Sequence, residues 1–152
     1  MNNIFRFLFL LFLNFYFTIG QSFADENRIK IGLLIPLTGD NAELGKQIVK
    51  ATRMALKDIN SDNIEIYPKD TQSDPTKTLR SAKELNQKGI KLVIGPVFHD
   101  NLIYLDEVSD TTFLSLTNKT LDLPKNVIST GVNSTSQINA IKKFIELNEI
   151  KK

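Results

Sequence analysis

Few residues in this chain could carry out covalent chemistry. The 152-residue sequence has no cysteine, and His99 is its only histidine. No serine stands between the glycines of a nucleophile elbow. A nucleophile needs an adjacent base, and a zinc site needs several Cys or His ligands. The sequence therefore predicts no catalytic residue, no metal site and no cofactor.

Three loops carry groups that could instead bind a polar ligand. Each follows an expected buried strand, and they are residues 36–41, 95–100 and 117–120. Ligands of open parallel sheets bind outside the carboxyl ends of the strands. His99 could contact an anionic group when protonated, and Asn118 and Thr120 offer an amide and a hydroxyl. A solvated histidine and ordinary turn chemistry are the alternative interpretations.

Two other patterns point to structure rather than to a site. Asp70 and Asp74 could recruit a cation from one loop, but a solvated turn and a helix N-cap explain them better. Gly39 and Gly45 match neither the dinucleotide nor the P-loop glycine spacing. Loop and helix-packing roles are therefore expected for both glycines.

The elements that must position these loops alternate between strand and helix. Apolar or alternating runs predict strands at 29–35, 64–67, 91–94, 113–116 and 127–129. Periodicity and caps predict helices at 42–60, 75–88, 100–109 and 135–148. This alternation predicts an α/β fold with a doubly wound, mostly parallel sheet. The chain is too short for an eight-stranded barrel.

Caps and apolar faces refine the expected helices. Asp74 before Pro75 predicts an N-cap, and two capping boxes are expected, at Asp40 with Glu43 and at Ser134 with Gln137. The first helix has one apolar face, formed by Leu44, Ile48, Ala51, Ala55 and Ile59. Its cations lie largely elsewhere, at Lys46, Lys50, Arg53 and Lys57.

The first 24 residues have the pattern of a secretory signal peptide. A positive start precedes an apolar run rich in Phe and Leu, and small residues lead to cleavage after Ala24. An uncleaved anchor is the alternative, but the run is shorter than the roughly 20 residues of a membrane span. Without a cysteine at the cleavage point, lipid attachment is not expected. We expect a periplasmic protein with no stable membrane span.

Charge argues against some partners. The formal net charge is +2, and no basic run occurs. The chain therefore has no electrostatic footprint for nucleic acid or for an anionic membrane.

Several stretches together resemble a known family. IKIGLLIPLTGDNAELGKQIVKATRMALKDIN, DTQSDP and GIKLVIGPV are similar to the first lobe of type I periplasmic binding proteins of the leucine/isoleucine/valine-binding kind. GLLIPL and GPVF are closer to penicillin-binding protein activators. The resemblance implies a flavodoxin-like strand order and a clamshell of two lobes. Residues 25–131 would form the first lobe, and 132–152 the crossover and first helix of a second lobe that is missing.

The resemblance also implies a site and two functions. His99 stands where amino-acid-binding members have a serine, and Asn118, Lys119 and Thr120 stand at their Ala-Ala-Thr stretch, of which only Thr120 is retained. Leu44 stands where some relatives place an aromatic residue, and we expect it in the core. The implied function is binding of a small polar ligand, such as an amino acid, for an ABC permease. The alternative is regulation of a cell-wall synthase through protein contact.

The last expected helix separates a lobe from a complete small domain. A complete secreted flavodoxin-like domain would bury this helix on the sheet. If the chain stops before a second lobe, the helix leaves an exposed apolar stripe, formed by Ile138, Ile141, Phe144 and Ile145.

Overall fold

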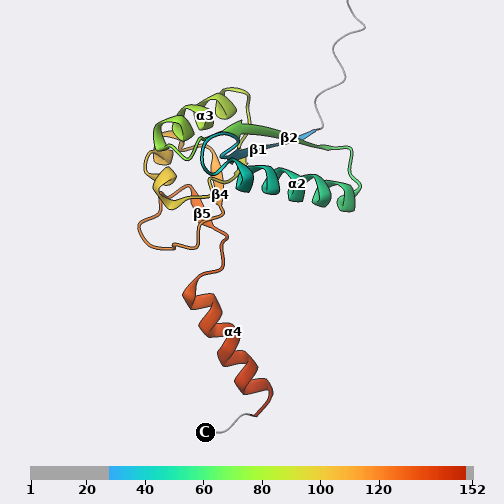
Figure 1. The fold of residues 1–152 in the computed structure, drawn as a ribbon, viewed down its shortest axis with the longest axis vertical. Helices are drawn as coiled ribbons and strands as arrows, with labels where there is room; N and C mark the ends of the chain where they lie inside the picture. The colour runs from blue at the N-terminus through green and yellow to red at the C-terminus, as the bar shows by residue number, and fades with distance from the viewer. Residues whose placement is uncertain (1–27, 150–152) are drawn as a thin grey trace, which may run out of the picture.

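A five-stranded, all-parallel sheet forms the centre of the molecule. The computed structural model describes residues 28–149, and the expected signal peptide lies outside them. The strand order is β2-β1-β3-β4-β5. The strands are β1 (Ile29–Ile35), β2 (Ile64–Asp70), β3 (Leu92–Ile94), β4 (Thr112–Ser115) and β5 (Val127–Ser129). The predicted α/β fold with a parallel sheet is confirmed (Figure 1).

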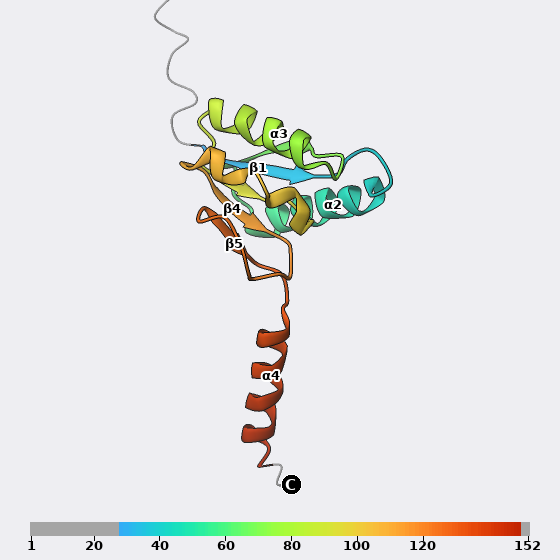
Figure 2. The same ribbon diagram turned by 90° about the vertical axis from the view of Figure 1, so that its left-hand side faces the viewer.

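Helices cover the two faces of the sheet unequally. Helix α3 (Pro75–Gln87) and two 3₁₀ turns, η1 (His99–Leu102) and η2 (Leu105–Val108), lie on one face. Helix α2 (Ala42–Ile59) lies on the other face, as Figure 2 shows. The last helix, α4 (Ser134–Leu147), follows β5 and extends away from the sheet.

The core lies between the sheet and the layer formed by α3 and the two 3₁₀ turns. Phe113 is its largest side chain and is fully buried. Strand residues, α3 residues and 3₁₀ residues contribute to one cluster, which includes Leu34, Val93, Phe113, Ala82, Leu85, Leu102, Leu105 and Val108. Ala82 and Leu85 of α3 are fully buried in it. Burial of side chains of this size is the main source of the stability of the lobe.

The rotation of α2 differs from the expectation. Leu44 is 42% exposed, so its expected place in the core is wrong. Among the residues of α2, only Gly45 is buried. A Cβ atom at Gly45 would lie 1.8 Å from the carbonyl oxygen of Pro36, so the helix backbone approaches the end of β1 very closely. This contact turns Gly45 toward the sheet and leaves the predicted apolar face on the flank of the helix.

The expected helix over 100–109 is replaced by the turns η1 and η2. Three apolar residues of these turns, Leu102, Leu105 and Val108, are buried. Their spacing of three residues matches the 3₁₀ period of 3.0 better than the α period of 3.6. The sequence therefore predicted a helical segment here but the wrong helix type.

Of the three predicted caps, one is confirmed, one is shifted by one residue and one is absent. The side chain of Asp74 accepts a hydrogen bond from the Lys77 N–H at 2.7 Å, which confirms this N-cap. Helix α2 begins after Asn41 without a side-chain cap, so the box expected at Asp40 is wrong. The capping box of α4 uses Asn133 and Ser136, one residue before the expected pair. At an N-cap, an asparagine side chain accepts a backbone hydrogen bond as well as a serine side chain does, and Asn133 comes one residue before Ser134.

Helix α4 does not pack on the sheet. All of its described residues are exposed (Figures 1 and 2). Its apolar stripe is open to solvent, with Ile138 52%, Ile141 60%, Phe144 61% and Ile145 41% exposed. This exposure argues against the complete flavodoxin-like domain, in which the helix would cover the sheet. Within residues 28–149, no helix combines the length and the apolarity that crossing a bilayer requires.

Candidate ligand-binding site

The three loops singled out in the sequence meet at the carboxyl edge of the sheet. The hydroxyl of Ser115 and the N–H of Leu116 both donate to the carbonyl oxygen of Pro96, at 2.9 and 3.0 Å. The N–H of Gly95 donates to the carbonyl oxygen of Leu114 at 2.8 Å. We call residues 36–41, 95–100 and 117–120 the strand-end wall. Its parts from β3 and β4 are fixed to each other by these bonds.

Asp70, at the end of β2, organises the loop that follows β1. Its carboxylate accepts hydrogen bonds from the N–H of Leu37 at 2.8 Å, the hydroxyl of Thr38 at 2.5 Å and the N–H of Gln72 at 3.0 Å. Desolvation raises the pKa of Asp70, but the bonds from Thr38, Gln72 and Leu37 outweigh that effect and hold the pKa below the usual aspartate value. The loop is therefore held best while this carboxylate is ionised.

Gly95 allows the closest approach within the wall. Its φ is +101°, and a Cβ atom here would lie 2.1 Å from the carbonyl oxygen of Leu34. The peptide bond from Gly95 to Pro96 is cis. Only glycine combines this backbone conformation with this contact. The residue thus brings the β3 loop against the end of β1.

The loop after β4 is fixed from the side of β5. The carbonyl oxygen of Thr117 accepts from the hydroxyl of Ser129 at 2.7 Å and from the N–H of Gly131 at 3.1 Å. The hydroxyl of Thr130 donates to the carbonyl oxygen of Ser115 at 2.8 Å. Thr117 itself is buried, whereas the three residues after it are exposed. Residues 118–120 therefore extend into solvent from a fixed base.

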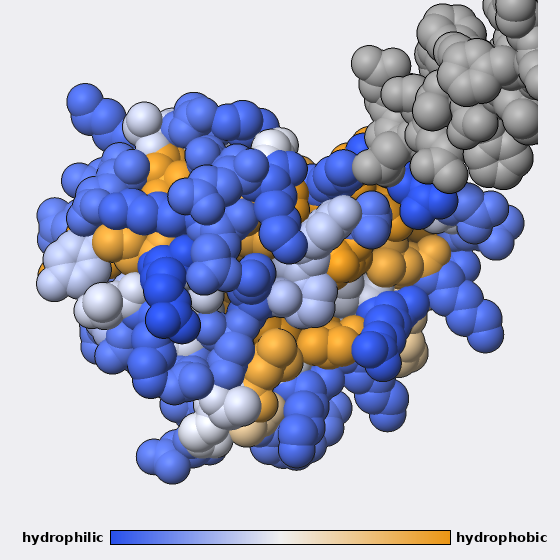
Figure 3. Space-filling view, turned by 90° about the horizontal axis from the view of Figure 1, so that it is seen from above, coloured by the Kyte–Doolittle hydropathy of each residue, from blue (hydrophilic) through white to orange (hydrophobic). Residues whose placement is uncertain are grey.

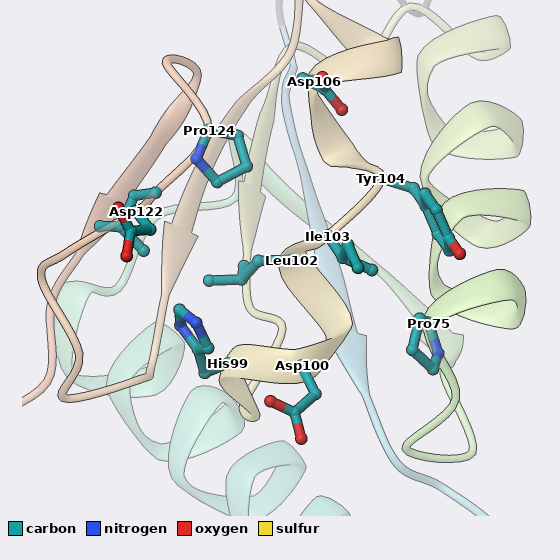
Figure 4. Close-up of a pocket in the computed structure, with 10 residues that line it drawn as sticks. Pro75, His99, Asp100, Leu102, Ile103, Tyr104, Asp106, Asp122 and Pro124 are labelled. Carbon is teal, nitrogen blue, oxygen red and sulfur yellow. The ribbon is translucent and has the colours of Figure 1, made fainter.

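His99 lines a hollow of 670 Å³ between η1 and the loop before β5. In Figure 4, His99 and Leu102 point toward the loop that carries Asp122 and Pro124, whereas Tyr104 points away from it. The Nδ1 atom of His99 is buried and has no hydrogen-bond partner within the described residues. An imidazole nitrogen in this state can accept or donate one further hydrogen bond.

The four predicted ligand residues do not share one pocket. His99 lines the 670 Å³ hollow, and Asn118, Lys119 and Thr120 do not. They do stand next to each other in the fold, because β3 and β4 are neighbouring strands and both loops leave the same edge. The arrangement can offer hydrogen bonds to a polar molecule on an open surface. It contains no nucleophile paired with a base.

The structure also tests for a metal site and gives Asp70 a role that the sequence did not indicate. Among residues 28–149, no three His, Cys, Asp or Glu side chains are grouped so that they could hold a metal ion. The expectation of a solvated turn at Asp70 does not include its bonds to Leu37 and Thr38. An acidic residue at the carboxyl end of a strand, beside a strand-end loop with free N–H groups, is the signal that could have indicated this role.

Comparison with known proteins identifies the family. A family model described as "Periplasmic binding protein" matches residues 28–145. The chain belongs to this family. A Leu/Ile/Val-binding protein homolog 1 from Brucella abortus is 37% identical over 82 residues, which cover 50% of this chain and 21% of that protein. The Leu/Ile/Val-binding protein BraC3 from Rhizobium johnstonii is 26% identical over 133 residues, covering 79% of this chain and 36% of that protein.

Solved structures agree on the fold. The leucine-binding protein LivK from Thermotoga maritima has a TM-score of 0.61 at 17% identity, covering 79% of this chain and 37% of that one. The C-domain of LpoA from Haemophilus influenzae, a regulator of PBP1A, has a TM-score of 0.65 at 22% identity, covering 80% of this chain and 38% of that one. The chain therefore has the fold of one lobe of a type I periplasmic binding protein, and it spans well under half the length of these relatives. The family model that matches is one of periplasmic binding proteins and not one of enzymes.

Proposed function

We propose that this chain is the first lobe of a periplasmic solute-binding protein that takes up a small polar ligand, such as an amino acid, for an ABC permease. The observation that carries the proposal is the strand-end wall, whose loops are fixed to one another by backbone and hydroxyl hydrogen bonds. In this proposal residues 1–24 are a cleaved signal peptide, and 25–131 form the lobe. Residues 132–152 then form the crossover and the first helix of a second lobe.

The mechanism follows from a wall that is fixed but open. In the complete protein the ligand would bridge two lobes and shift an equilibrium between open and closed forms. His99, Asn118, Lys119 and Thr120 are the residues we propose to contact the ligand. One wall buries little of a small molecule, so the chain alone should bind an amino acid with at best millimolar affinity. Micromolar binding to the chain alone would contradict this account.

The test is an NMR titration, because amide shifts report weak binding residue by residue. Residues 25–152 labelled with ¹⁵N are titrated with leucine, isoleucine and valine. The expected shifts gather at the amides of 95–100 and 117–120. The variants His99→Ala and Thr120→Ala should reduce these shifts. The variant Thr112→Ala is the matched control, since this exposed threonine lies at the opposite end of β4.

Two results of the titration would contradict the proposal. One is a set of shifts that gathers away from the strand-end wall, for example along α3. The other is a response of the wall that Thr112→Ala weakens as much as Thr120→Ala does. Either result would mean that these loops are not the ligand surface of the lobe.

The second candidate function is regulation of a cell-wall synthase through protein contact. It is favoured by the departures from the amino-acid-binding pattern at His99, Asn118 and Lys119, and by the likeness of GLLIPL and GPVF to activator proteins. A pull-down from periplasmic extract separates the two functions. Enrichment of a transpeptidase would support the regulator, and recovery of permease components would support solute uptake.

A further inference from the structure

A groove runs along the side of α2 that faces β2. Two adjoining hollows form it, of 410 and 120 Å³, and both are lined by Val49, Arg53 and Pro68. We call it the α2 groove. It lies on the opposite flank of α2 from Leu44, and it is separate from the hollow that His99 lines.

The outer rim of the α2 groove is cationic. Lys46, Lys50 and Arg53 line it, and Lys57 continues the same line one turn further along the helix. Positions i, i+4, i+7 and i+11 fall on one stripe of an α-helix. Lys46 lies 3.8 Å from Glu43, and within the described residues no carboxylate lies within 4.0 Å of the other three cations. The stripe is therefore a row of charges that the described lobe leaves largely unneutralised.

The floor of the α2 groove is apolar and recessed. Its side chains are half-buried between helix and strand, and they include Leu37, Val49, Leu56 and Ile66. Figure 3, seen from the side that carries β2 and α3, shows apolar surface bordered by hydrophilic side chains. An anionic bilayer fits such a groove poorly, because membrane-binding helices place their apolar side chains outermost. A rigid partner with projecting apolar side chains fits better.

The edge of β2 restricts the form of that partner. Among the described strands, β2 pairs only with β1, so its outer edge is open. Pro68 lies within β2 and has no N–H to donate to an added strand. The groove therefore favours a helix over an extended peptide. The stripe from Lys46 to Lys57 is about 16 Å long, which corresponds to about three helical turns.

We propose that the α2 groove binds an acidic amphipathic helix of a partner protein. Carboxylates spaced along one side of that helix would face the cationic stripe. Aliphatic side chains spaced at i, i+3 or i+4, and i+7 would fill the apolar floor, as in other helix-in-groove complexes. Charge complementarity then sets the orientation and the rate of association, and the floor adds affinity.

The test uses a fluorescein-labelled synthetic peptide with glutamates at i, i+4, i+7 and i+11 beside a line of leucines. Its anisotropy is measured against residues 25–152. We expect binding that weakens as salt rises. The double variant Lys50→Glu/Arg53→Glu should weaken it by about tenfold or more. Lys142→Glu/Lys143→Glu on exposed α4 makes the same change of charge and should leave it unchanged.

Three further arms decide the proposal. A peptide with serines in place of the leucines should lose most of its binding, since it cannot fill the floor. The proposal would be overturned if the serine peptide bound as well as the leucine peptide, or if the Lys50→Glu/Arg53→Glu variant bound the leucine peptide as well as the parent chain does. It would also be overturned if the leucine peptide did not bind. Binding of phosphatidylglycerol vesicles that depends on Lys50 and Arg53 in place of peptide binding would overturn it as well. Circular dichroism confirms that each variant is folded.

Discussion

Replacing Gly45 with alanine should change the stability of the chain in two opposite ways, through helix propensity and through packing. Alanine is better than glycine in a helix interior by about 1 kcal/mol, so the sequence alone predicts that Gly45→Ala stabilises the chain. The structure predicts the opposite. The new Cβ would lie 1.8 Å from the carbonyl oxygen of Pro36, and Cβ contacts below 3.0 Å are essentially never seen. The Cβ is held rigidly by the helix backbone and the oxygen belongs to the chain backbone, so α2 and the end of β1 would have to separate by about 1.2 Å to reach 3.0 Å.

Overpacking of this kind costs typically 1 to 3 kcal/mol, and a clash between two backbones belongs at the upper end. After the helix gain, Gly45→Ala should lower the free energy of unfolding by about 2 kcal/mol. Urea unfolding followed by circular dichroism measures this, with an unchanged m-value as the check on two-state behaviour. Gly32→Ala is the matched control. The nearest atoms that its Cβ would meet are side-chain atoms of Leu85 and Val93, at 2.8 and 2.9 Å, and not backbone atoms, so the sheet itself need not move. A stabilised Gly45→Ala chain, or a larger loss in Gly32→Ala, would refute the reasoning.

Three further predictions concern the loops and α4. The two hydrogens of Asn126 Nδ2 are shared among three backbone carbonyl oxygens around η2, at 2.8 to 3.2 Å, so Asn126→Ala should lower the free energy of unfolding in urea by about 1 to 3 kcal/mol. Asp70→Asn should cost about 1 kcal/mol near neutral pH, discounted for solvent exposure. Because the pKa of Asp70 is lowered in the folded state, its stabilising contribution is present above the unfolded pKa and is lost as the pH falls. In urea unfolding at several pH values, the difference in unfolding free energy between the parent chain and Asp70→Asn should therefore narrow below about pH 4. A difference that stays constant with pH would count against this role of Asp70. Ile141→Ser/Phe144→Ser should reduce self-association in sedimentation velocity without changing the stability of the lobe, and unchanged association would show that the stripe plays no part.

The sequence predicted the strands and the carboxyl edge well, because the strands are short apolar or alternating runs that end at a turn. It also predicted the N-cap at Asp74, where the signal is local. Its errors arose where a tertiary contact decides. The spacing of Leu44 and its apolar neighbours is truly helical, but the contact of Gly45 with Pro36 rotates that face away from the sheet.

The sequence predicted where the candidate site lies, but not how its side chains are arranged. The rule for parallel sheets located the loops, and the bonds of Pro96 and Thr117 show that they are joined. No pattern in the sequence indicates that His99 turns into a hollow while Asn118 stays in solvent, since this depends on η1 being a 3₁₀ turn. The charged stripe of α2 was visible in the sequence, but its groove requires the position of β2.

Amide hydrogen exchange of the intact chain, resolved by NMR, tests most directly whether α4 belongs to a second lobe or packs on this one. The account predicts that the amides of Ser134–Leu147 exchange far faster than those of β1, β3 and β4, because every described side chain of α4 is exposed. Protection of the α4 amides equal to that of Val93 and Phe113 would mean that the helix packs on the sheet. That result would contradict the assignment of this chain as a single open lobe.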